Sequence, residues 1–294
     1  MTGTGSTTEQ DALFTEHRSM VFAVAYQVLG TRAEADDVVQ EAYLRWADVD
    51  LSRVRDPRAY LAAIATRTAL NRVRTVSRLR ETYPGPWLPE PLVADHENPE
   101  QRLLMKEQLS YALTVLLRQA TPEQRVVFVL HDVFGLPYPA VAEAVGKTQG
   151  SVRQIAHRAR TRLSTTDHDT GATGDGAEVL EAFLAAVGTG DLQALMDVLA
   201  PDVVLLSDGG GKVVAALKPV TGAEPVAFFL LKIARNPVPQ LRVAIDSLNG
   251  GLGVLIWSGD RLELTVALDV DERDKVTGVY LVRNPDKLAR RTDA

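Results

Sequence analysis

The chain has 294 residues, of which 46% are hydrophobic and 24% charged, and its formal net charge is −6. This size and composition indicate two or three globular domains, and the acidic balance argues against unaided binding to duplex DNA through a broadly basic surface. The absence of cysteine excludes disulfides and thiol catalysis, and without a membrane-length apolar run or a signal-peptide region we expect a cytoplasmic protein that does not enter membranes.

The first 80 residues predict three helices. Residues 1–10 are rich in Gly, Ser and Thr, and we expect them to be disordered. One helix is predicted from Asp11 to Leu29, and a second begins at the capping box Thr31–Glu34 and ends near Asp48. A polar loop follows, and Pro57 begins the third helix, which extends to about Arg80.

The second helix separates an apolar face from an acidic one. The apolar face consists of Ala35, Val38, Val39, Ala42 and Trp46. The other face consists of Asp36, Asp37, Gln40, Glu41 and Arg45. Such an acidic face is either solvated surface or a docking surface for a basic protein, and the pattern alone leaves both open.

The third helix is strongly basic. Its inner stripe is Tyr60, Leu61, Ile64, Ala65 and Thr68, and its arginines are Arg58, Arg67, Arg72, Arg74, Arg78 and Arg80. Arginine is favoured at a helix C-terminus, but this explains only the last turn. The helix and the loop Asp48–Asp56 therefore indicate a nucleic-acid surface.

Residues 81–98 contain four prolines and predict an extended linker. Trp87 and Leu88 lie inside it, and because a solvated tether has no use for tryptophan we expect the WLPEP segment (87–91) to pack on another part of the protein, if only on the nearest helical domain. Two helices follow, one over 99–118 and one from the capping box Thr121–Gln124 to Phe134.

Residues 137–163 predict a helix-turn-helix. Gly146 ends a short first helix, and Thr148 caps the second. The inner side chains of the second helix are Val152, Ile155, Ala156, Ala159 and Leu163. Its outer side chains are Gln149, Arg153, Gln154, His157 and Arg158, with Ser151 in the first turn. A basic helix face is often only solvated surface, but the glycine turn, the cap and the lack of acids favour DNA in a major groove.

The C-terminal part has a different texture. After a polar linker, helices are predicted over 177–187 and 192–199, and a further helix begins at the capping box Thr221–Glu224 and ends near Arg235. Strands are predicted over 203–206, 213–217, 241–248, 253–257, 261–269 and 276–283. Helices followed by a curved antiparallel sheet make an α+β cone. The expected division is 11–80, 81–98 (linker), 99–165, 166–176 (linker) and 177–294.

Three segments together resemble a known family: ADDVVQEAYLRW (35–46), DPRAYLAAIATRTALNRVR (56–74) and residues 121–163. They are similar to the two defining regions of extracytoplasmic-function sigma factors, the small initiation subunits of bacterial RNA polymerase. The resemblance implies a multidomain protein with two all-α sigma domains, the second with a helix-turn-helix. It also implies two partners, promoter DNA and core polymerase, the latter bound at its flap and at the clamp coiled coil of its largest subunit.

The resemblance also implies roles for residues. Docking on the clamp coiled coil is implied for Asp36, Asp37, Gln40, Glu41, Arg45 and Trp46. Holding the melted −10 element is implied for Arg53, Arg55, Arg67, Asn71 and Arg74. Reading the −35 duplex is implied for Gln149, Ser151, Arg153, Gln154, His157 and Arg158. Family members often carry Asp at the position of Asn71, so no carboxylate role carries over there.

The rest of the chain resembles the subgroup that carries a C-terminal SnoaL-like domain of the nuclear-transport-factor-2 (NTF2) superfamily. The motifs are WLPEP (87–91), DGGGK (208–212) and NPDKL (284–288). The resemblance implies autoregulatory contacts in place of a separate anti-sigma factor, made by Trp87, Leu88, Pro89, Glu90, Pro91, Asp208, Gly209, Gly210, Gly211, Lys212, Asn284, Pro285, Asp286, Lys287 and Leu288. We expect the indole of Trp87 to be buried against the other two motifs, where a large aromatic contributes up to about 3 kcal/mol.

Two other functions remain open. SnoaL-like cones include enzymes, and the candidate acids here are Asp202, Asp208, Asp246, Asp260 and Glu263. The DGGGK segment is also typical of a hairpin turn, and without the rest of a P-loop pattern it does not indicate a phosphate site. A one-component repressor would explain the helix-turn-helix but not the acidic helix or WLPEP. We therefore expect no catalytic residue, metal or cofactor, while a small-molecule ligand of the cone stays possible.

Overall fold

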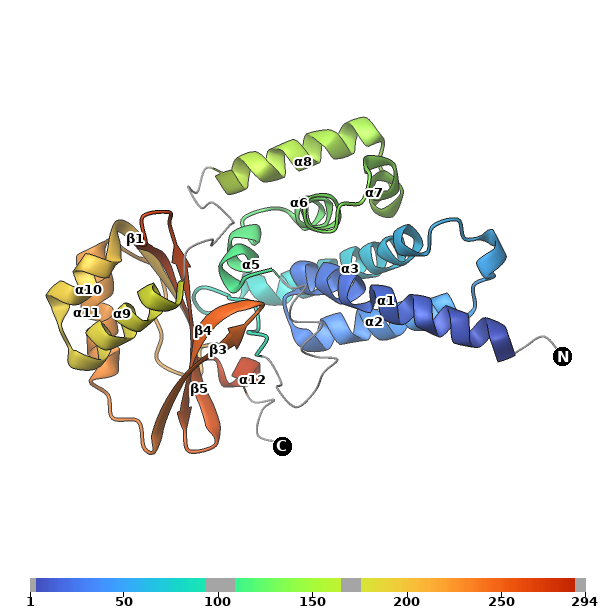
Figure 1. Cartoon of the computed structure of the whole chain (residues 1–294). Coiled ribbons are helices and arrows are strands. Elements are labelled where there is room, and N and C mark those ends of the chain that lie inside the picture. Colours follow the sequence, from blue (N-terminus) through green and yellow to red (C-terminus); the bar gives the residue numbers. More distant parts are fainter. Residues whose placement is uncertain (1–3, 94–108, 165–175, 289–294) are drawn as a thin grey trace. The chain divides into compact units, whose positions relative to one another are not determined.

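The computed structural model describes residues 4–93, 109–164 and 176–288 (Figure 1). It divides into two compact units. Unit 1 comprises Met1–Glu81, Pro99–Gln108 and Leu116–Thr165, and unit 2 comprises Thr82–Asn98, Leu109–Val115 and Thr166–Ala294. In the described ranges, no helix combines the length and the apolar character needed to cross a membrane.

Unit 1 is helical. Its elements are α1 (Thr4–Leu29), α2 (Arg32–Ala47), the 3-10 helix η1 (Leu51–Arg53), α3 (Pro57–Glu81), α6 (Pro122–Phe128), the π-helical turn η2 (Val129–Val133), α7 (Tyr138–Val145) and α8 (Gln149–Ser164). A further helix, α5 (Tyr111–Leu117), is divided between the two units. The predicted apolar face of α2 is confirmed, since all five of its side chains are buried.

The start of α1 corrects the expected disorder for residues 4–10, whereas residues 1–3 lie outside the described residues. The helix begins at Thr4, and Gln10 is buried. Trp46 donates its indole N–H to the carbonyl oxygen of Gln10 at 2.8 Å, and the Gln10 amide donates to the carbonyl of Val49 at 3.1 Å. These bonds hold the first turns of α1 against the end of α2. The polar composition of this segment does not predict such contacts.

Three further local predictions need correction. Tyr60 is 40% exposed and does not belong to the inner stripe of α3. Leu109 and Ser110 are not helical, so the helix predicted over 99–118 does not run through them, and its first part lies outside the described residues. The Thr121–Gln124 capping box is confirmed, but the helix predicted to follow it passes into a π-helical turn at Val129.

A buried arginine fixes α6 against α1. Arg125 is only 6% exposed, and its guanidinium donates to the carbonyl oxygens of Gln27 and Val28 at 3.0 and 3.2 Å. Arg118 donates to the same Val28 carbonyl at 3.0 Å. These carbonyls belong to the last turn of α1, where a helix presents acceptors without intrahelical partners.

Unit 2 has the predicted α+β class, but its sheet is mixed rather than wholly antiparallel, because β1 and β6 run parallel. Its elements are α9 (Gly176–Thr189), α10 (Leu192–Val198), β1 (Leu199–Asp208), β2 (Val220–Thr221), α11 (Ala223–Ala234), β3 (Leu241–Leu248), β4 (Gly251–Ser258), β5 (Arg261–Val270), β6 (Val276–Val282) and α12 (Pro285–Leu288). The sheet order is β2-β1-β6-β5-β4-β3, with β1 and β6 parallel and the other pairs antiparallel. Helices α9, α10 and α11 lie together on one side of the sheet (Figure 1).

The sheet is apolar on both faces. In β6, Val279 and Leu281 pack towards α9–α11, while Tyr280 and Val282 belong to a second core on the opposite face. Leu88 of the linker and one side of α5 belong to that second core. A strand covered on both sides does not alternate between apolar and polar residues, and in VTGVYLV the four residues Val279–Val282 are all buried.

Two predictions in unit 2 are wrong. Residues 213–217 form no strand, and β1 pairs antiparallel with the short β2 instead, so DGGGK is a turn at the start of a long connection between these two strands. Thr221 does not cap α11, because it belongs to β2 and the cap is Gly222 at φ +95° without a side-chain bond.

Candidate functional site

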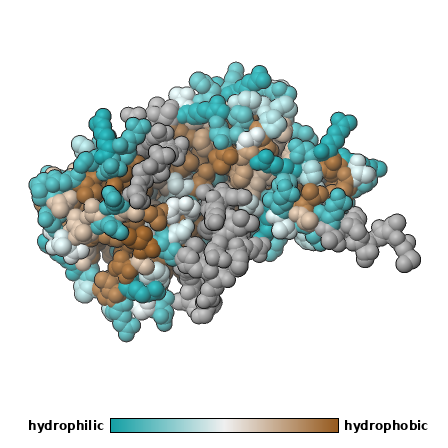
Figure 2. All heavy atoms as spheres, in the orientation of Figure 1, coloured by the Kyte–Doolittle hydropathy of each residue, from teal (hydrophilic) through white to brown (hydrophobic). Residues whose placement is uncertain are grey.

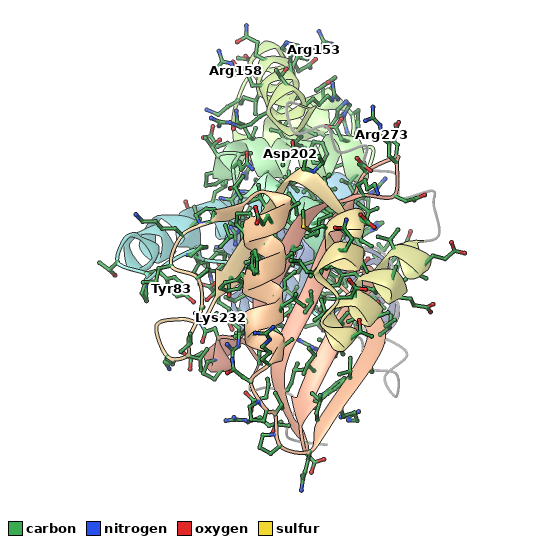
Figure 3. The ribbon with its side chains drawn as sticks, turned by 90° about the vertical axis from the view of Figure 1, so that its left-hand side faces the viewer. Tyr83, Arg153, Arg158, Asp202, Lys232 and Arg273 are labelled. Carbon is green, nitrogen blue, oxygen red and sulfur yellow. The ribbon has the colours of Figure 1, made fainter. Side chains whose placement is uncertain are left out.

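Helix α8 separates a buried face from an exposed face as its periodicity predicts. Val152, Ala156 and Ala159 are buried. The predicted outer side chains are exposed: Gln149, Arg153, Gln154, His157 and Arg158. Figure 3 shows Arg153 and Arg158 pointing outward from the helix. Hydrogen-bond donors spaced along one helix face in this way can reach phosphates and base edges in a groove.

The turn before α8 is fixed by local chemistry. Gly146 adopts φ +68° at the end of α7, a left-handed conformation that glycine tolerates best. Thr148 accepts the backbone N–H of Ser151 at 3.3 Å, and the two hydroxyl groups lie 2.9 Å apart, so the half-buried Ser151 contributes to the cap of α8. Arg160 bonds Asp132 at 2.6 Å, and this bond raises the pKa of the Arg160 guanidinium above its usual range. Arg160 thus supports α8 from its other side.

The acidic face of α2 is a mixed ionic network. Arg72 of α3 donates to Asp37 at 3.0 Å and to Glu41 at 3.2 Å. Along α2 itself, Asp36 lies 3.6 Å from Arg32, and Glu41 lies 2.6 Å from Arg45. The sequence pattern missed Arg72 because it is on another helix, more than 30 residues away.

Trp46 is not part of the exposed face of α2. Its relative exposure is 0%, which corrects its placement among the docking side chains, and it supports the face from below. The exposed face also carries large apolar groups that the helical pattern did not single out: Leu44 is 66% exposed and Tyr43 39%. Tyr60 of α3, whose ring centre lies 5.9 Å from that of Trp46, is 40% exposed. Tyr43 donates to Asp11 at 3.0 Å, and this bond raises the pKa of its phenol. Exposed apolar groups beside paired charges are typical of a protein-binding surface.

The residues expected to hold single-stranded DNA lie on η1, the loop after it and α3. Arg53 and Arg55 are exposed, and Arg53 lies 3.2 Å from Asp50, the N-cap of η1. On α3, Arg67 and Asn71 are exposed one helical turn apart, and the side chain of Arg74 lies outside the described residues. Arg67 is not fully available, because it donates to the carbonyl oxygen of Glu143 on α7 at 3.0 Å.

In unit 2 the three motifs meet around one buried carboxylate. Asp208 is 1% exposed and accepts the backbone N–H groups of Leu88 at 2.9 Å and Gly210 at 3.0 Å. It also accepts the Tyr83 hydroxyl at 2.5 Å and the Lys287 ammonium at 2.6 Å. A buried carboxylate requires such a full set of donors, because an unpaired buried charge is strongly unfavourable. We call these four partners and Asp208 the clasp.

Aromatic and glycine residues complete the surroundings of the clasp. The Lys287 ammonium lies 4.1 Å from the ring centre of Trp87 and also bonds the carbonyl of Leu88. Gly210 has φ +62°, and a Cβ there would lie 2.5 Å from the amide of Asn284. Asn284 donates to the Tyr83 hydroxyl at 2.8 Å. Burial and then the bond to Asp208 raise the pKa of Tyr83 well above its ordinary value.

Trp87 lies against the NPDKL motif as expected, through its contact with Lys287, but it is not the buried anchor. Its indole is half-buried, whereas the neighbouring Leu88 is 1% exposed and is the side chain that enters the core. Tyr83 was not predicted, because a lone tyrosine four residues before WLPEP gives no periodic signal. Lys212 and Asp286 form an exposed pair at 2.6 Å at the rim of the clasp.

The candidate catalytic acids of unit 2 are distributed over β1, β3, β5 and the turn after β4. Asp202 and Asp260 are exposed, Asp246 and Glu263 are half-buried, and Asp208 is committed to the clasp. A pocket of about 330 Å³ lies beside the turn between α9 and α10, and none of these acids lines it. Its lining residues are Val187, Gly188, Thr189, Gly190, Leu231, Ala234 and Arg235.

Comparisons with known proteins cover both units. Residues 13–79 match the family model Sigma-70 region 2, and residues 110–163 match Sigma-70, region 4. The chain is 36% identical to ECF RNA polymerase sigma factor SigJ of Mycobacterium tuberculosis over 92% of this chain and 90% of SigJ. It is 30% identical to the probable ECF RNA polymerase sigma factor SigI of the same organism over 94% of each. A crystal structure of M. tuberculosis SigJ matches with a TM-score of 0.75 and 34% identity, over 96% of this chain and 98% of that one.

Proposed function

Because the chain belongs to the extracytoplasmic-function (ECF) RNA polymerase sigma factors, we propose that it brings core polymerase to promoters through four interactions of unit 1. The exposed face of α2 docks on the clamp coiled coil of the largest subunit. The loop with η1 and the exposed side of α3 hold the unpaired −10 strand, where cations and a base pocket are needed. Helix α8 reads the −35 duplex, and the helix-turn-helix domain docks on the flap.

One observation carries this proposal. Helix α8 presents only hydrogen-bond donors and cations on its outer face, on a chain whose formal net charge is −6. A local basic face suits a subunit that meets DNA while held by a larger partner, because phosphate neutralisation by the whole chain is unfavourable.

Run-off transcription with core polymerase tests the proposal. The template is a duplex fragment enriched from random sequence by the reconstituted full-length holoenzyme. Replacing Arg153 and Arg158 by Ala removes two donors, each worth about 1–3 kcal/mol of recognition, so transcript yield falls at least about tenfold. Lys232→Ala, which removes an exposed cation from α11 of unit 2 (Figure 3), is the matched control. Equal yields from both variants would exclude α8 as the reader.

We also propose that the clasp lets unit 2 regulate the sigma domains without a separate anti-sigma protein. The support is that the linker between the two sigma regions supplies Tyr83 and Leu88 to a buried carboxylate of unit 2. A change in the clasp therefore changes the path of the linker. We assign no catalysis to unit 2, since none of its candidate acids lines the pocket beside α9, and a small ligand in that pocket would act as an effector.

The regulatory proposal is tested in the full chain. Asp208→Asn weakens the clasp, and Val279→Ala, which truncates a fully buried side chain of the other core face, is a control for lost stability. Run-off yield at saturating core polymerase is expected to change severalfold with Asp208→Asn and to stay unchanged with Val279→Ala. If both variants transcribe like the parent chain, the clasp is structural only.

A further inference from the structure

Among the described residues, the outermost strand of unit 2 has one edge that no other strand covers. β3 ends the sheet order and pairs only with β4 along its length. In the described part of the chain, the single bridge Val93–Leu248 reaches its other edge, at the hairpin end. Leu241, Val243 and Ile245 are 57%, 47% and 39% exposed, and Figure 2 shows hydrophobic side chains over the strands of unit 2, at the lower left. A long apolar edge is a template for pairing with another chain.

The register of the hairpin shows which backbone groups point outward. Asn249 and Gly250, at φ +49° and +74°, form the two-residue turn, so Leu248 and Gly251 are a hydrogen-bonded pair. Hydrogen-bonded pairs alternate along an antiparallel ladder, and the even-numbered residues of β3 therefore bond β4. The N–H and C=O groups of Val243 and Ile245 point to the open edge.

The side chains of β3 are self-complementary in one register only. We propose that β3 pairs antiparallel with β3 of a second copy about a two-fold axis through Ala244, joining the two sheets. Val243 then bonds Ile245 of the other copy in both directions, which gives four backbone hydrogen bonds. On the opposite face Arg242 lies across from Asp246 of the other copy, in the closely spaced, non-hydrogen-bonded positions where opposite charges stabilise a pair. Shifting the centre by one residue either way places Arg242 opposite Ala244 or Leu248.

This inference does not depend on the promoter recognition proposed above. The occupant of the edge is a second copy of the chain, because the two charges flank Ala244 symmetrically and with opposite sign. An edge pairing of this length buries far less than the roughly 1,600 Å² of a standard interface, so we expect a dissociation constant on the order of 10–100 μM.

Sedimentation equilibrium of the full chain tests the pairing. The parent chain is expected to approach twice its mass of 32.0 kDa as its concentration rises through that range. Arg242→Glu alone and Asp246→Arg alone place like charges opposite each other twice, so each variant stays monomeric. An equimolar mixture of the two restores both opposite-charge pairs and the dimer.

Val243→Pro supplies a second test that leaves the charges unchanged. It removes an N–H that points away from β4, so the hairpin keeps its ladder while the edge is blocked, and thermal unfolding of each variant verifies that it folds. A parent chain that remains monomeric overturns the proposal. So does a mixture of the charge variants that behaves like each alone, or a Val243→Pro chain that still dimerises.

Discussion

The clasp in unit 2 and the Arg72 network in unit 1 both pair a basic side chain with carboxylates, but one is buried and the other is exposed. Lys287 lies 2.6 Å from Asp208, and their side chains are 7% and 0% exposed. Arg72 lies 3.0 Å from Asp37 and 3.2 Å from Glu41, and the three side chains are 35%, 61% and 32% exposed. A buried pair has lost its hydration and tolerates no missing partner, while an exposed pair contributes little and can exchange partners. The first therefore fixes a conformation, and the second stays open to binding.

The largest effect is expected from removing one member of the clasp. Lys287→Met leaves the buried Asp208 carboxylate without its cation, which costs about 3–5 kcal/mol of unfolding free energy. Urea unfolding of the full chain, together with protease cleavage within residues 82–93, measures the loss. The double variant Asp208→Asn with Lys287→Met removes both charges and should recover much of it. A loss below about 1 kcal/mol in the single variant would contradict the contrast drawn above.

The second prediction compares the contributions of two neighbouring linker side chains, Leu88 and Trp87, to the free energy of unfolding. Leu88→Ala deletes a fully buried side chain and should destabilise unit 2 by about 2–5 kcal/mol. Trp87→Ala removes a half-buried ring that contacts Lys287, and we expect about 1 kcal/mol. The same urea titration measures both. A larger loss for Trp87 than for Leu88 would make the tryptophan the anchor after all.

Local periodicity was sufficient for much of the fold. The buried side of α2, the two faces of α8 and the bounds of β3 follow from spacing within one element. The failures fall where tertiary contacts decide. Residues 213–217 have the composition of a strand, yet Val214 is 84% exposed and no neighbouring strand pairs with the segment. Propensity alone does not supply a pairing partner.

The candidate sites were less predictable than the fold. The resemblance indicated the motifs of the clasp, but not that Leu88 rather than Trp87 is the buried anchor, nor that Tyr83 completes the donor set of Asp208. The pairing of Arg72 was not predicted either, because its carboxylate partners lie on another helix. Spacing within an element predicts which residues share a face, whereas contacts between elements depend on the whole packing.

A buried and an exposed tyrosine should also differ in how they change the free energy of unfolding with pH. Burial, and next the nearby Asp269, raise the pKa of Tyr280 in unit 2 far above its ordinary value of about 10. Its stabilising contribution is complete below that pH and is lost as the pH rises above it, by up to about 1.4 kcal/mol per pH unit. Unfolding free energies measured from pH 9 upward should therefore fall less steeply for Tyr280→Phe than for the parent chain.

Tyr43 is the matched control for this pH series. Its pKa is also raised, by the bond to Asp11, but the phenol is in contact with solvent. Tyr43→Phe should leave the slope of stability against pH almost unchanged. Equal slopes for Tyr280→Phe and the parent chain would show that ionisation of the buried tyrosine is not linked to unfolding.

The smallest change in stability, and the one most directly tied to function, is expected at Arg72. Arg72→Ala removes an exposed guanidinium and should alter the unfolding free energy by less than about 1 kcal/mol. It also leaves Asp37 without its α3 partner and Glu41 with Arg45 alone, which makes the α2 face more negative. If that face docks on a basic surface of core polymerase, association at low salt becomes roughly two- to fivefold faster and more sensitive to salt.

The control for Arg72 is an exposed pair of unit 2, for which no contact with core polymerase is proposed. The guanidinium of Arg261 donates to Glu263 at 2.7 Å, and 70% and 27% of the two side chains are exposed. Arg261→Ala removes a guanidinium and makes the same change in net charge. In stopped-flow experiments, the association rates of the two variants with core polymerase should therefore differ at low salt and become equal at high salt. Identical rates at every salt concentration would mean that the paired acids of α2 do not meet the polymerase, and the docking surface would then have to lie elsewhere on unit 1.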